Sequence, residues 1–308
     1  MARLLGYTHP ACLGHDTGPG HPECADRLGA VLEALDAAFP EMEWVEAPRA
    51  TRGQLLRVHD PRLLAAVLTP PPPGHSRLDP DTVVSPGSPE AALRAAGAGV
   101  AATEAVMHGE ADVAFCAVRP PGHHATGDAA MGFCLFDNIA VAAAHALDRF
   151  GLARVAVVDF DVHHGNGTQD IFWSDKDLFF ASTHQMPLYP GTGAESERGA
   201  GNIFNAPLRP NAGGEEFRDA MKSRILPALR NFSPDIVLIS AGFDAHEADP
   251  LASLRFQEDD FAWATEELCE AAERSAKGRV VSMLEGGYDL TALARSVGVH
   301  VKILMDAA

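Results

Sequence analysis

After residue 90, the sequence alternates short apolar segments with longer helix-like ones. The apolar segments are rich in β-branched and aromatic residues: ADVAFCAV (111–118), ARVAVVDF (153–160), KDLFFAST (176–183), PDIVLISA (234–241) and GRVVSMLE (278–285). The helix-like segments are AALRAAGAGVAATEAVMHG (91–109), DNIAVAAAHALDRF (137–150), GGEEFRDAMKSRILPALRNF (213–232) and EDDFAWATEELCEAAERSA (258–276). Near-continuous apolar strands alternating with helices are typical of a parallel sheet covered on both faces. The sequence therefore predicts an α/β fold with one open parallel sheet flanked by helices.

The whole chain, residues 1–308, is predicted to form a single domain. Its length permits one large α/β domain or two small ones. The sequence has no internal repeat, low-complexity tract or long charge run that would mark a linker. The proline-rich segment TPPPPGHSRLDPD (69–81) is short and indicates a surface loop.

Cysteine usage and hydropathy indicate a cytoplasmic protein. No apolar run approaches the roughly 20 residues of a membrane span, and the first residues lack the apolar core of a signal peptide. The cysteines are odd in number and never spaced C-x-x-C, so we expect reduced, mostly buried thiols rather than disulfides or a thiolate zinc site. They are Cys12, Cys24, Cys116, Cys134 and Cys269. Any metal must therefore be bound by histidine and carboxylate.

The formal net charge is −18, and the sequence has no cluster of basic residues. A nucleic-acid surface needs clustered Lys and Arg, so we expect no nucleic-acid partner. The acidity is compatible with cationic substrates such as lysine-rich peptides or polyamines, and equally with a role in solubility alone.

Polar clusters follow four of the predicted strands. RPPGHH (119–124), DVHHGNGTQD (161–170), AGFDAHEADP (241–250) and EGGYDL (285–290) each begin where an apolar segment ends. Open α/β sheets place their sites at the carboxyl ends of the strands. The sequence therefore predicts that these four clusters converge on one crevice.

Two of these clusters contain a candidate metal site. Asp161 and His163 are spaced i, i+2, which in an extended segment directs both side chains the same way. Asp244 adds a second carboxylate from a later strand. Three such ligands leave a position open, as in catalytic divalent sites, where a bound water has a pKa of about 7. The alternative is a capping carboxylate and a loop histidine without a metal.

The other two clusters carry candidate groups for proton transfer and for binding an oxyanion. His123 and His124 are adjacent in a stretch of Gly and Pro, and imidazole can move a proton near neutral pH. Tyr288 follows Gly286 and Gly287, which let the backbone turn sharply beside a ligand. Its phenol could donate to a polarised carbonyl, or it could simply pack at a helix start.

Together these motifs resemble the zinc-dependent histone deacetylase superfamily, which includes bacterial acetylpolyamine amidohydrolases and acetoin-utilisation proteins. The resemblance rests on RPPGHHA, GFCLFDN, VDFDVHHGNGTQ, SAGFDAH followed by DPL, and LEGGY, in this order. It extends from residue 18 to residue 288, nearly the whole chain. The resemblance implies an arginase/deacetylase-like fold, and Asn166 follows the class II pattern.

The resemblance also implies roles for the site residues. Zinc would be bound by Asp161, His163 and Asp244. Such a site also accepts Fe²⁺ or Co²⁺.

The tandem histidines would flank the zinc-bound water, with His124 as the main general base and acid and His123 stabilising charge. Asp159 would pair with His123 and Asn166 with His124, so the two rings should differ in pKa. Tyr288 would bind the scissile carbonyl and the oxyanion.

The family's substrate tunnel maps onto further residues. Phe133, beside Gly132, matches one aromatic wall, and Gly286 also belongs to the substrate-binding set. The facing wall usually has Phe before PGTG, whereas this sequence has Tyr189, which bears on the tunnel's width and apolarity. Asp81 either grips the substrate backbone at the rim or is a solvated loop carboxylate.

Monovalent-ion and product sites follow from the same resemblance. The family's structural K⁺ site matches Asp159, Asp161, His163 and Ser182, with the backbone of Thr183. A second K⁺ site would lie near Phe172, and Arg27 matches an arginine of the acetate-release channel.

The expected activity is hydrolysis of an acetylated or longer acylated lysine side chain in a peptide or protein. The main alternative is an acetylpolyamine amidohydrolase, although no large insertion narrows the entrance between GYTHPACLGHDTGPGHPE and the first helix. An arginase-like ureohydrolase needs a further bridging carboxylate, but Gly165 stands two residues after His163. A non-catalytic acyl-amine binding protein would normally have lost one of these groups. We expect no membrane partner, and an oligomer is compatible with the sequence.

Overall fold

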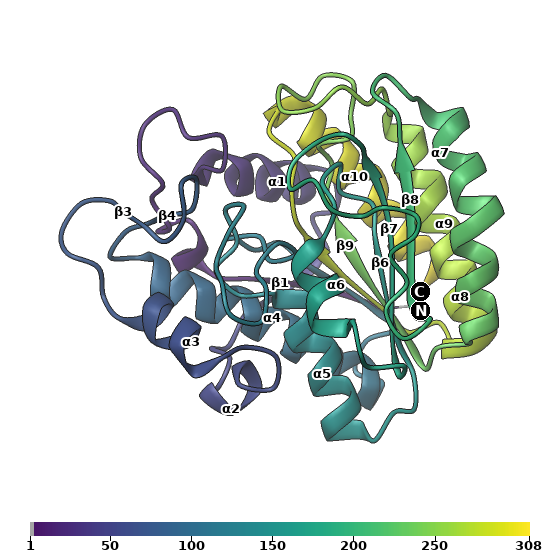
Figure 1. The fold of residues 1–308 in the computed structure, drawn as a ribbon, viewed down its shortest axis with the longest axis horizontal. Helices are drawn as coiled ribbons and strands as arrows, with labels where there is room; N and C mark the ends of the chain where they lie inside the picture. Colours follow the sequence, from purple (N-terminus) through teal and green to yellow (C-terminus); the bar gives the residue numbers. More distant parts are fainter. Residues whose placement is uncertain (1–2) are drawn as a thin grey trace.

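The computed structural model describes residues 3–308, and in this part of the chain the main sheet has eight strands, all parallel (Figure 1). In spatial order they are β2 (Glu43–Glu46), β1 (Leu4–Thr8), β5 (Val113–Cys116), β10 (Val280–Leu284), β9 (Ile236–Ala241), β6 (Val155–Asp159), β7 (Leu178–Gln185) and β8 (Ile203–Leu208). The five strands predicted from the sequence are β5, β6, β7, β9 and β10, so the predicted open parallel sheet is confirmed.

The three strands that the sequence did not predict are less regular than the others. β2 and β8 are the sheet edges, and β8 contains Asn205 and Pro207, which are uncommon inside strands. β1 contains Gly6, over which the Trp44 ring packs so closely that a Cβ would lie 2.6 Å from it. These features weaken the strand signal of β1 and β8 in the sequence.

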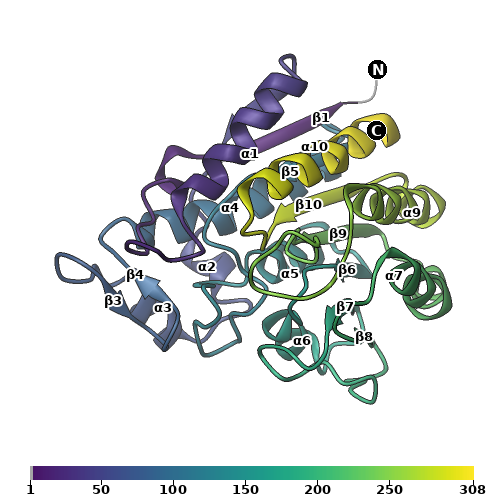
Figure 2. The same cartoon turned by 90° about the horizontal axis from the view of Figure 1, so that it is seen from above.

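Helices cover both faces of the sheet (Figure 2). One layer contains α1 (Ala25–Ala38), α10 (Leu290–Ala307), α9 (Glu258–Ala276), α7 (Gly214–Ala220) and α8 (Leu226–Phe232). The other contains α4 (Ser88–His108), α5 (Asn138–Phe150) and α6 (Asn166–Phe172), with α2 (Arg52–Leu55) and α3 (Pro61–Leu68) packed outside. The predicted helices over 91–109, 137–150 and 258–276 correspond to α4, α5 and α9.

The predicted helix over 213–232 is not a single α-helix. A π-helical turn, Met221–Ile225, separates α7 from α8. Pro227 stands at the start of α8 and has no N–H to continue the α-helical hydrogen-bond ladder, so the chain passes this point with a wider turn.

Helix ends are defined by side chains that the sequence contains. Asp137 accepts a hydrogen bond from the N–H of Ala140 and begins α5, and Asp289 does the same for Ala292 in α10. Gly109 and Gly151 end α4 and α5 in the left-handed conformation.

The central strands form the core of the molecule. Every residue of β6, β9 and β10 is buried, because helices cover both faces. Each fully buried Val, Leu or Ile side chain contributes about 1.5–3 kcal/mol. This packing holds the carboxyl ends of these strands rigidly in place.

Other sequence expectations concern the loops and cysteines. Segment 69–81 is mainly loop, but β3 (Ser76–Arg77) within it pairs antiparallel with β4 (Val83–Val84). All five cysteines are free thiols, and four of them are buried. Within residues 3–308, no helix combines the length and apolarity needed to cross a membrane.

Candidate active site

The four polar clusters lie at the carboxyl ends of four adjacent strands. β5, β10, β9 and β6 are neighbours in the sheet, and RPPGHH, EGGY, AGFD and DVHH follow them. The predicted convergence on one crevice is present. A pocket of about 210 Å³ opens there, lined by Asp81, His124, Gly132, Phe133, His163, Leu188, Tyr189, Leu251 and Tyr288.

The base of the crevice holds the predicted carboxylate–imidazole cluster. His163 Nδ1 lies 3.1 Å from Asp161 Oδ1 and 3.1 Å from Asp244 Oδ2. One ligand atom from each of the three residues lies within 4.8 Å of the others, and all three residues are buried. The backbone fixes the carboxylates: Gly286 N donates to Asp161 at 2.8 Å, and Val162 N donates to Asp244 at 2.9 Å.

This donor set fits a divalent cation. Burial and the neighbouring Asp161 raise the pKa of Asp244 to about 7, so the two carboxylates need a positive charge between them. Burial alone would lower the pKa of His163, yet Asp161 and Asp244 raise it to about 10, which reports a strongly negative potential. Two oxygens and one imidazole leave a coordination position free for water or substrate.

The tandem histidines lie beside this cluster with different partners. His123 Nδ1 donates to Asp159 Oδ2 at 2.9 Å, and His124 Nδ1 donates to Asn166 Oδ1 at 2.7 Å. Burial lowers the pKa of both rings. Asp159 and Asp161 outweigh it at His123, whose pKa is well above the usual value. At His124, the charges of His123 and His163 add to burial and hold the pKa well below the usual value. The two predicted pairings are present, and the rings differ in pKa as expected.

Tyr288 reaches the pocket from the segment after β10. Its backbone N–H donates to Asp249 Oδ2 at 2.7 Å, and its ring lies 4.8 Å from the Arg27 guanidinium carbon. Burial raises the pKa of Tyr288 well above 10, although Arg27 opposes this. The phenol therefore remains a neutral O–H donor at physiological pH.

The pocket walls contain both predicted aromatic residues. Phe133 has φ of +69°, and its N–H donates to Thr82 Oγ1 at 3.2 Å. The ring of Tyr189 lies 5.1 Å from that of His124 and is 38% exposed, so it borders the entrance. Gly132 also lines the pocket, and a Cβ there would overlap the His124 ring.

Asp81 lines the outer part of the pocket and is half-buried. Its pKa is raised by burial and by the neighbouring carboxylate of Asp79. Asp81 therefore borders the pocket, and its contact with a substrate backbone stays a prediction.

The residues of the predicted K⁺ site are neighbours across the β6–β7 pair. Ser182 stands opposite Asp159 in the sheet register, and its hydroxyl is hydrogen-bonded to His184 Nδ1 at 2.9 Å. Phe172 is buried in α6, away from the pocket lining. The K⁺ assignments stay predictions.

Sequence reasoning missed several residues of the site. Leu188 and Leu251 line the pocket, and neither was named from the sequence, although Leu188 precedes Tyr189 and Leu251 ends the DPL motif. Asp249 anchors Tyr288 and also accepts from Leu251 N at 2.9 Å. Its place in the DPL motif could have drawn attention to it.

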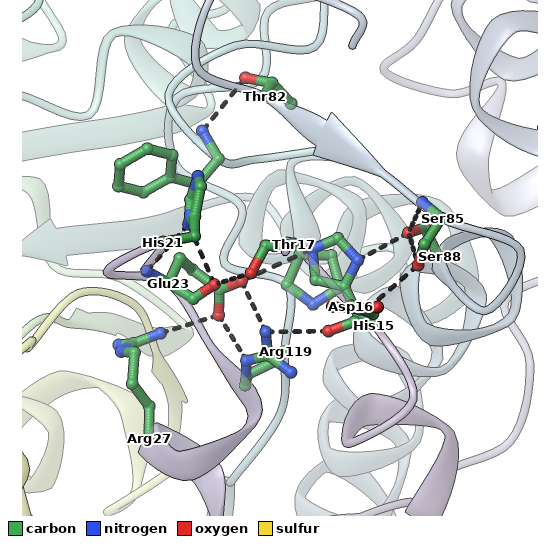
Figure 3. A network of polar contacts seen from close by, with 12 residues as sticks. His15, Asp16, Thr17, His21, Glu23, Arg27, Thr82, Ser85, Ser88 and Arg119 are labelled. Carbon is green, nitrogen blue, oxygen red and sulfur yellow. Dashed lines mark hydrogen bonds and ion pairs between the residues drawn. The ribbon is translucent and has the colours of Figure 1, made fainter. Parts of the chain in front are cut away.

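A buried charge network joins Arg27, which the resemblance indicated, to Glu23 and Arg119, which sequence reasoning missed (Figure 3). Glu23 bonds Arg119 Nε at 2.5 Å and Arg27 NH1 at 3.1 Å, and all three side chains are at most 1% exposed. Burial would raise the pKa of Glu23, but Arg119, His15 and Arg27 lower it to about 2. Arg27 Nε in turn donates to Gly287 O at 2.6 Å. This arginine therefore holds the backbone beside Tyr288.

Comparison with known proteins identifies the family of the chain. The sequence model of the histone deacetylase domain matches residues 21–304. A histone deacetylase-like amidohydrolase from Pseudomonas aeruginosa is 42% identical over 284 residues, covering 91% of this chain and 74% of the relative. A probable deacetylase from Archaeoglobus fulgidus is 37% identical over 290 residues, covering 92% of this chain and 80% of the relative.

The fold comparison leads to the same family. The crystal structure of the HDA15 HD domain superimposes with a TM-score of 0.94 at 35% sequence identity, covering 99% of this chain and 89% of that one. The architecture is thus the arginase/deacetylase-like fold expected from the sequence. The chain therefore belongs to the histone deacetylase family of hydrolases.

Proposed function

We propose that this protein is a zinc-dependent amidohydrolase that removes acetyl or other acyl groups from lysine side chains in the cytoplasm. The observation that carries the proposal is the buried Asp161–His163–Asp244 cluster, at the base of a pocket that also contains His124 and Tyr288. Relatives named as deacetylases and as an amidohydrolase support the reaction class.

Asp161, His163 and Asp244 would hold the zinc ion, and Asp159, Asp161, His163 and Ser182 would hold K⁺. When bound, a divalent cation supplies a Lewis acid for the scissile carbonyl and lowers the pKa of water. The chain's own groups then bind the substrate and move the protons.

The two histidines would perform different tasks. The Nδ1 atom of His124 is engaged by Asn166, which leaves Nε2 free to accept a proton from the attacking water. A low pKa keeps that ring neutral beforehand. His123, paired with Asp159, is held as an imidazolium and would stabilise developing negative charge. The proton accepted by His124 would then pass to the leaving amine.

The phenolic O–H of Tyr288 would donate a hydrogen bond to the carbonyl oxygen of the substrate. The hydrogen bond strengthens as charge develops on this oxygen, so it stabilises the transition state more than the bound substrate. Asp249 and Arg27 hold the segment that directs this hydroxyl into the pocket.

The pocket suits a single unbranched aliphatic chain. Phe133 and Tyr189 would flank it, with Leu188 and Leu251 completing an apolar wall. Asp81 at the rim could accept a hydrogen bond from a peptide N–H. Because Asp81 and Asp79 also make the rim acidic, an acetylpolyamine is the second candidate substrate.

A metal-removal and substrate experiment tests the proposal. Protein stripped with a chelator should lose hydrolysis of acetyl-lysine peptides and regain it with one equivalent of Zn²⁺, Co²⁺ or Fe²⁺. Asp244→Asn should bind metal weakly and remain inactive. We expect kcat/KM to be higher for acetyl-lysine peptides than for acetylputrescine or acetylspermidine. The reverse order would reassign the substrate, and full activity without metal would refute the mechanism.

A further inference from the structure

The proton-shuttling histidines and the phenol come from different segments of the chain. His123 and His124 follow β5, and Tyr288 follows β10, the neighbouring strand. Both segments are irregular beyond the strand ends, so the sheet hydrogen bonds do not fix their spacing. Some other contact must hold one against the other.

Glu285 makes that contact with its side chain. It is the first residue after β10 and is 1% exposed. Its Oε2 atom accepts hydrogen bonds from Gly122 N at 2.7 Å and from His123 N at 3.2 Å. One carboxylate thus binds two consecutive amides of the histidine segment.

The backbone of Glu285 is fixed in turn on its own side. Its N–H donates to Ala241 O at 2.9 Å, and its carbonyl accepts from Arg27 NH2 at 2.5 Å. Arg27 also holds Gly287 O, one residue before Tyr288. Glu285 is therefore joined rigidly to the segment that carries the phenol.

A second, longer connection links the same two segments (Figure 3). Glu23 binds both Arg27, which holds the Tyr288 segment, and Arg119, which begins the histidine segment. This path passes through three side chains, whereas Glu285 joins the segments through one. Glu285 is the direct tie.

We propose that Glu285 is a positioning residue, which sets the place of His123 and His124 relative to Tyr288 by accepting the Gly122 and His123 amide hydrogens. This inference rests on the proposed amidohydrolase function. Glu285 lies outside the pocket lining and is not assigned a contact with substrate.

Its role is that of a hydrogen-bond acceptor rather than a charge. The second oxygen, Oε1, is buried and has no hydrogen-bond partner among residues 3–308. Burial raises the pKa of Glu285 to about 8, so this environment favours a neutral side chain. An amide, which retains one acceptor oxygen, should therefore substitute for the carboxyl group.

Three variants test the proposal. Glu285→Gln keeps an acceptor for both amides, and Glu285→Ala removes it. Met283→Ala is the matched control, because Met283 is buried on the same strand and packs on Gly99 of α4, away from the site. Bound metal per chain and the thermal unfolding midpoint should be measured for each, so that a folded, metal-loaded protein is compared throughout.

Amide hydrogen exchange reports the contact without reference to activity. In Glu285→Ala, amide hydrogen exchange at residues 122 and 123 should accelerate on the order of 10- to 100-fold, because the carboxyl oxygen that accepts from both amides is removed. In Glu285→Gln and Met283→Ala, exchange at these two amides should stay close to wild type.

Kinetics on an acetyl-lysine peptide report the consequence. Glu285→Ala should lower kcat roughly 10- to 100-fold, since small displacements of catalytic groups have effects of this order. KM should change less than about threefold, because Glu285 makes no substrate contact. Glu285→Gln should recover most of kcat, and Met283→Ala should retain it.

The outcomes separate the possible failures. Equal losses in Glu285→Gln and Glu285→Ala would show that the charge matters and would overturn the acceptor role. Unchanged exchange and kcat in Glu285→Ala would overturn the positioning role. If the wild type hydrolyses no acyl-amine, the proposed function fails, while the exchange result still decides whether Glu285 anchors the histidine segment.

Discussion

The imidazole rings of His123 and His124 lie 4.1 Å apart at 40° to each other, yet one faces a carboxylate and the other an amide. Asp159 favours the imidazolium of His123. Asn166 carries no charge to oppose them, so burial and the positive charges of His123 and His163 lower the pKa of His124. The pKa values of two adjacent and chemically identical side chains are thereby shifted in opposite directions.

This relationship predicts the effect of Asn166→Asp. A carboxylate beside Nδ1 would raise the pKa of His124, and the base must be neutral to accept a proton. As the pH is lowered, the variant would therefore lose activity at a higher pH than the wild type does. The acid limb of the kcat/KM–pH profile should move to higher pH than in the wild type. An unmoved acid limb would contradict the role of His124 as general base.

Tyr288→Phe removes the phenolic donor but keeps the ring. We expect kcat to fall on the order of 10²–10³-fold, the typical loss for one missing oxyanion donor. Metal content and the unfolding midpoint should be close to wild type, because the ring still packs beside Arg27 and Phe133. Steady-state kinetics on an acetyl-lysine peptide provide the measurement. Near-normal turnover would remove Tyr288 from the mechanism.

Gly132→Ala should impair catalysis through His124. The added Cβ would overlap the His124 ring, so either the ring or the Gly132 backbone must move. Gly151→Ala is the control, since both glycines have positive φ, +55° and +60°, but Gly151 has no atom within 4 Å of the new Cβ. Both variants carry left-handed backbone strain of about 1–2 kcal/mol. Only Gly132→Ala should reduce kcat, by roughly 10²-fold. Equal activity of the two variants would show that the His124 position tolerates the crowding.

Glu23 links stability to pH. The pKa of Glu23 is 4.5 when the side chain is free in water, as in the unfolded chain, and about 2 in the folded protein. The unfolded chain therefore binds the proton first as pH falls. The stabilisation from Glu23 is therefore complete above pH 4.5 and is lost as pH falls toward 2. Glu23→Gln should lower the free energy of unfolding at pH 7 by about 3–5 kcal/mol, because two buried arginines lose their anion.

Urea unfolding at several pH values tests this prediction. The loss of stability between pH 4.5 and 2 should be smaller in Glu23→Gln than in wild type. Glu270→Gln is a suitable control, since it removes only a solvent-exposed pair with Arg274 and should leave the profile unchanged. Parallel profiles for Glu23→Gln and wild type would mean that the pKa of Glu23 is not depressed.

The apolar segments were sufficient to predict the central strands. β6, β9 and β10 are buried on both faces, so their residues are mainly apolar, apart from the buried Asp159, Ser240 and Ser282, and the pattern is visible in the sequence. Edge strands β2 and β8 lack this constraint, because β2 has exposed ends and β8 has half-buried positions, and the sequence did not identify them. The predicted helix over 213–232 lies where expected but contains a π-helical turn, since Pro227 interrupts the α-helical hydrogen-bond ladder.

For the site, the sequence by itself determined which side chains are available and at which strand ends they stand. Asp161 and His163 lie close together simply because a single residue, Val162, separates them in the chain, and the motifs of the family identified Asp244, His123, His124 and Tyr288 as their partners. Chemical type and order along the chain are local properties, which a sequence states directly.

Only the tertiary structure decided the spacing, burial and protonation of these groups. The contact between Glu285 and the Gly122 and His123 amides spans more than 160 residues of sequence, and that between Glu23 and Arg119 spans 96. The pKa values of the tandem histidines depend on which charges lie near each ring once both are buried. Such quantities depend on distances between remote segments, and these are fixed only when the sheet and its helices pack together.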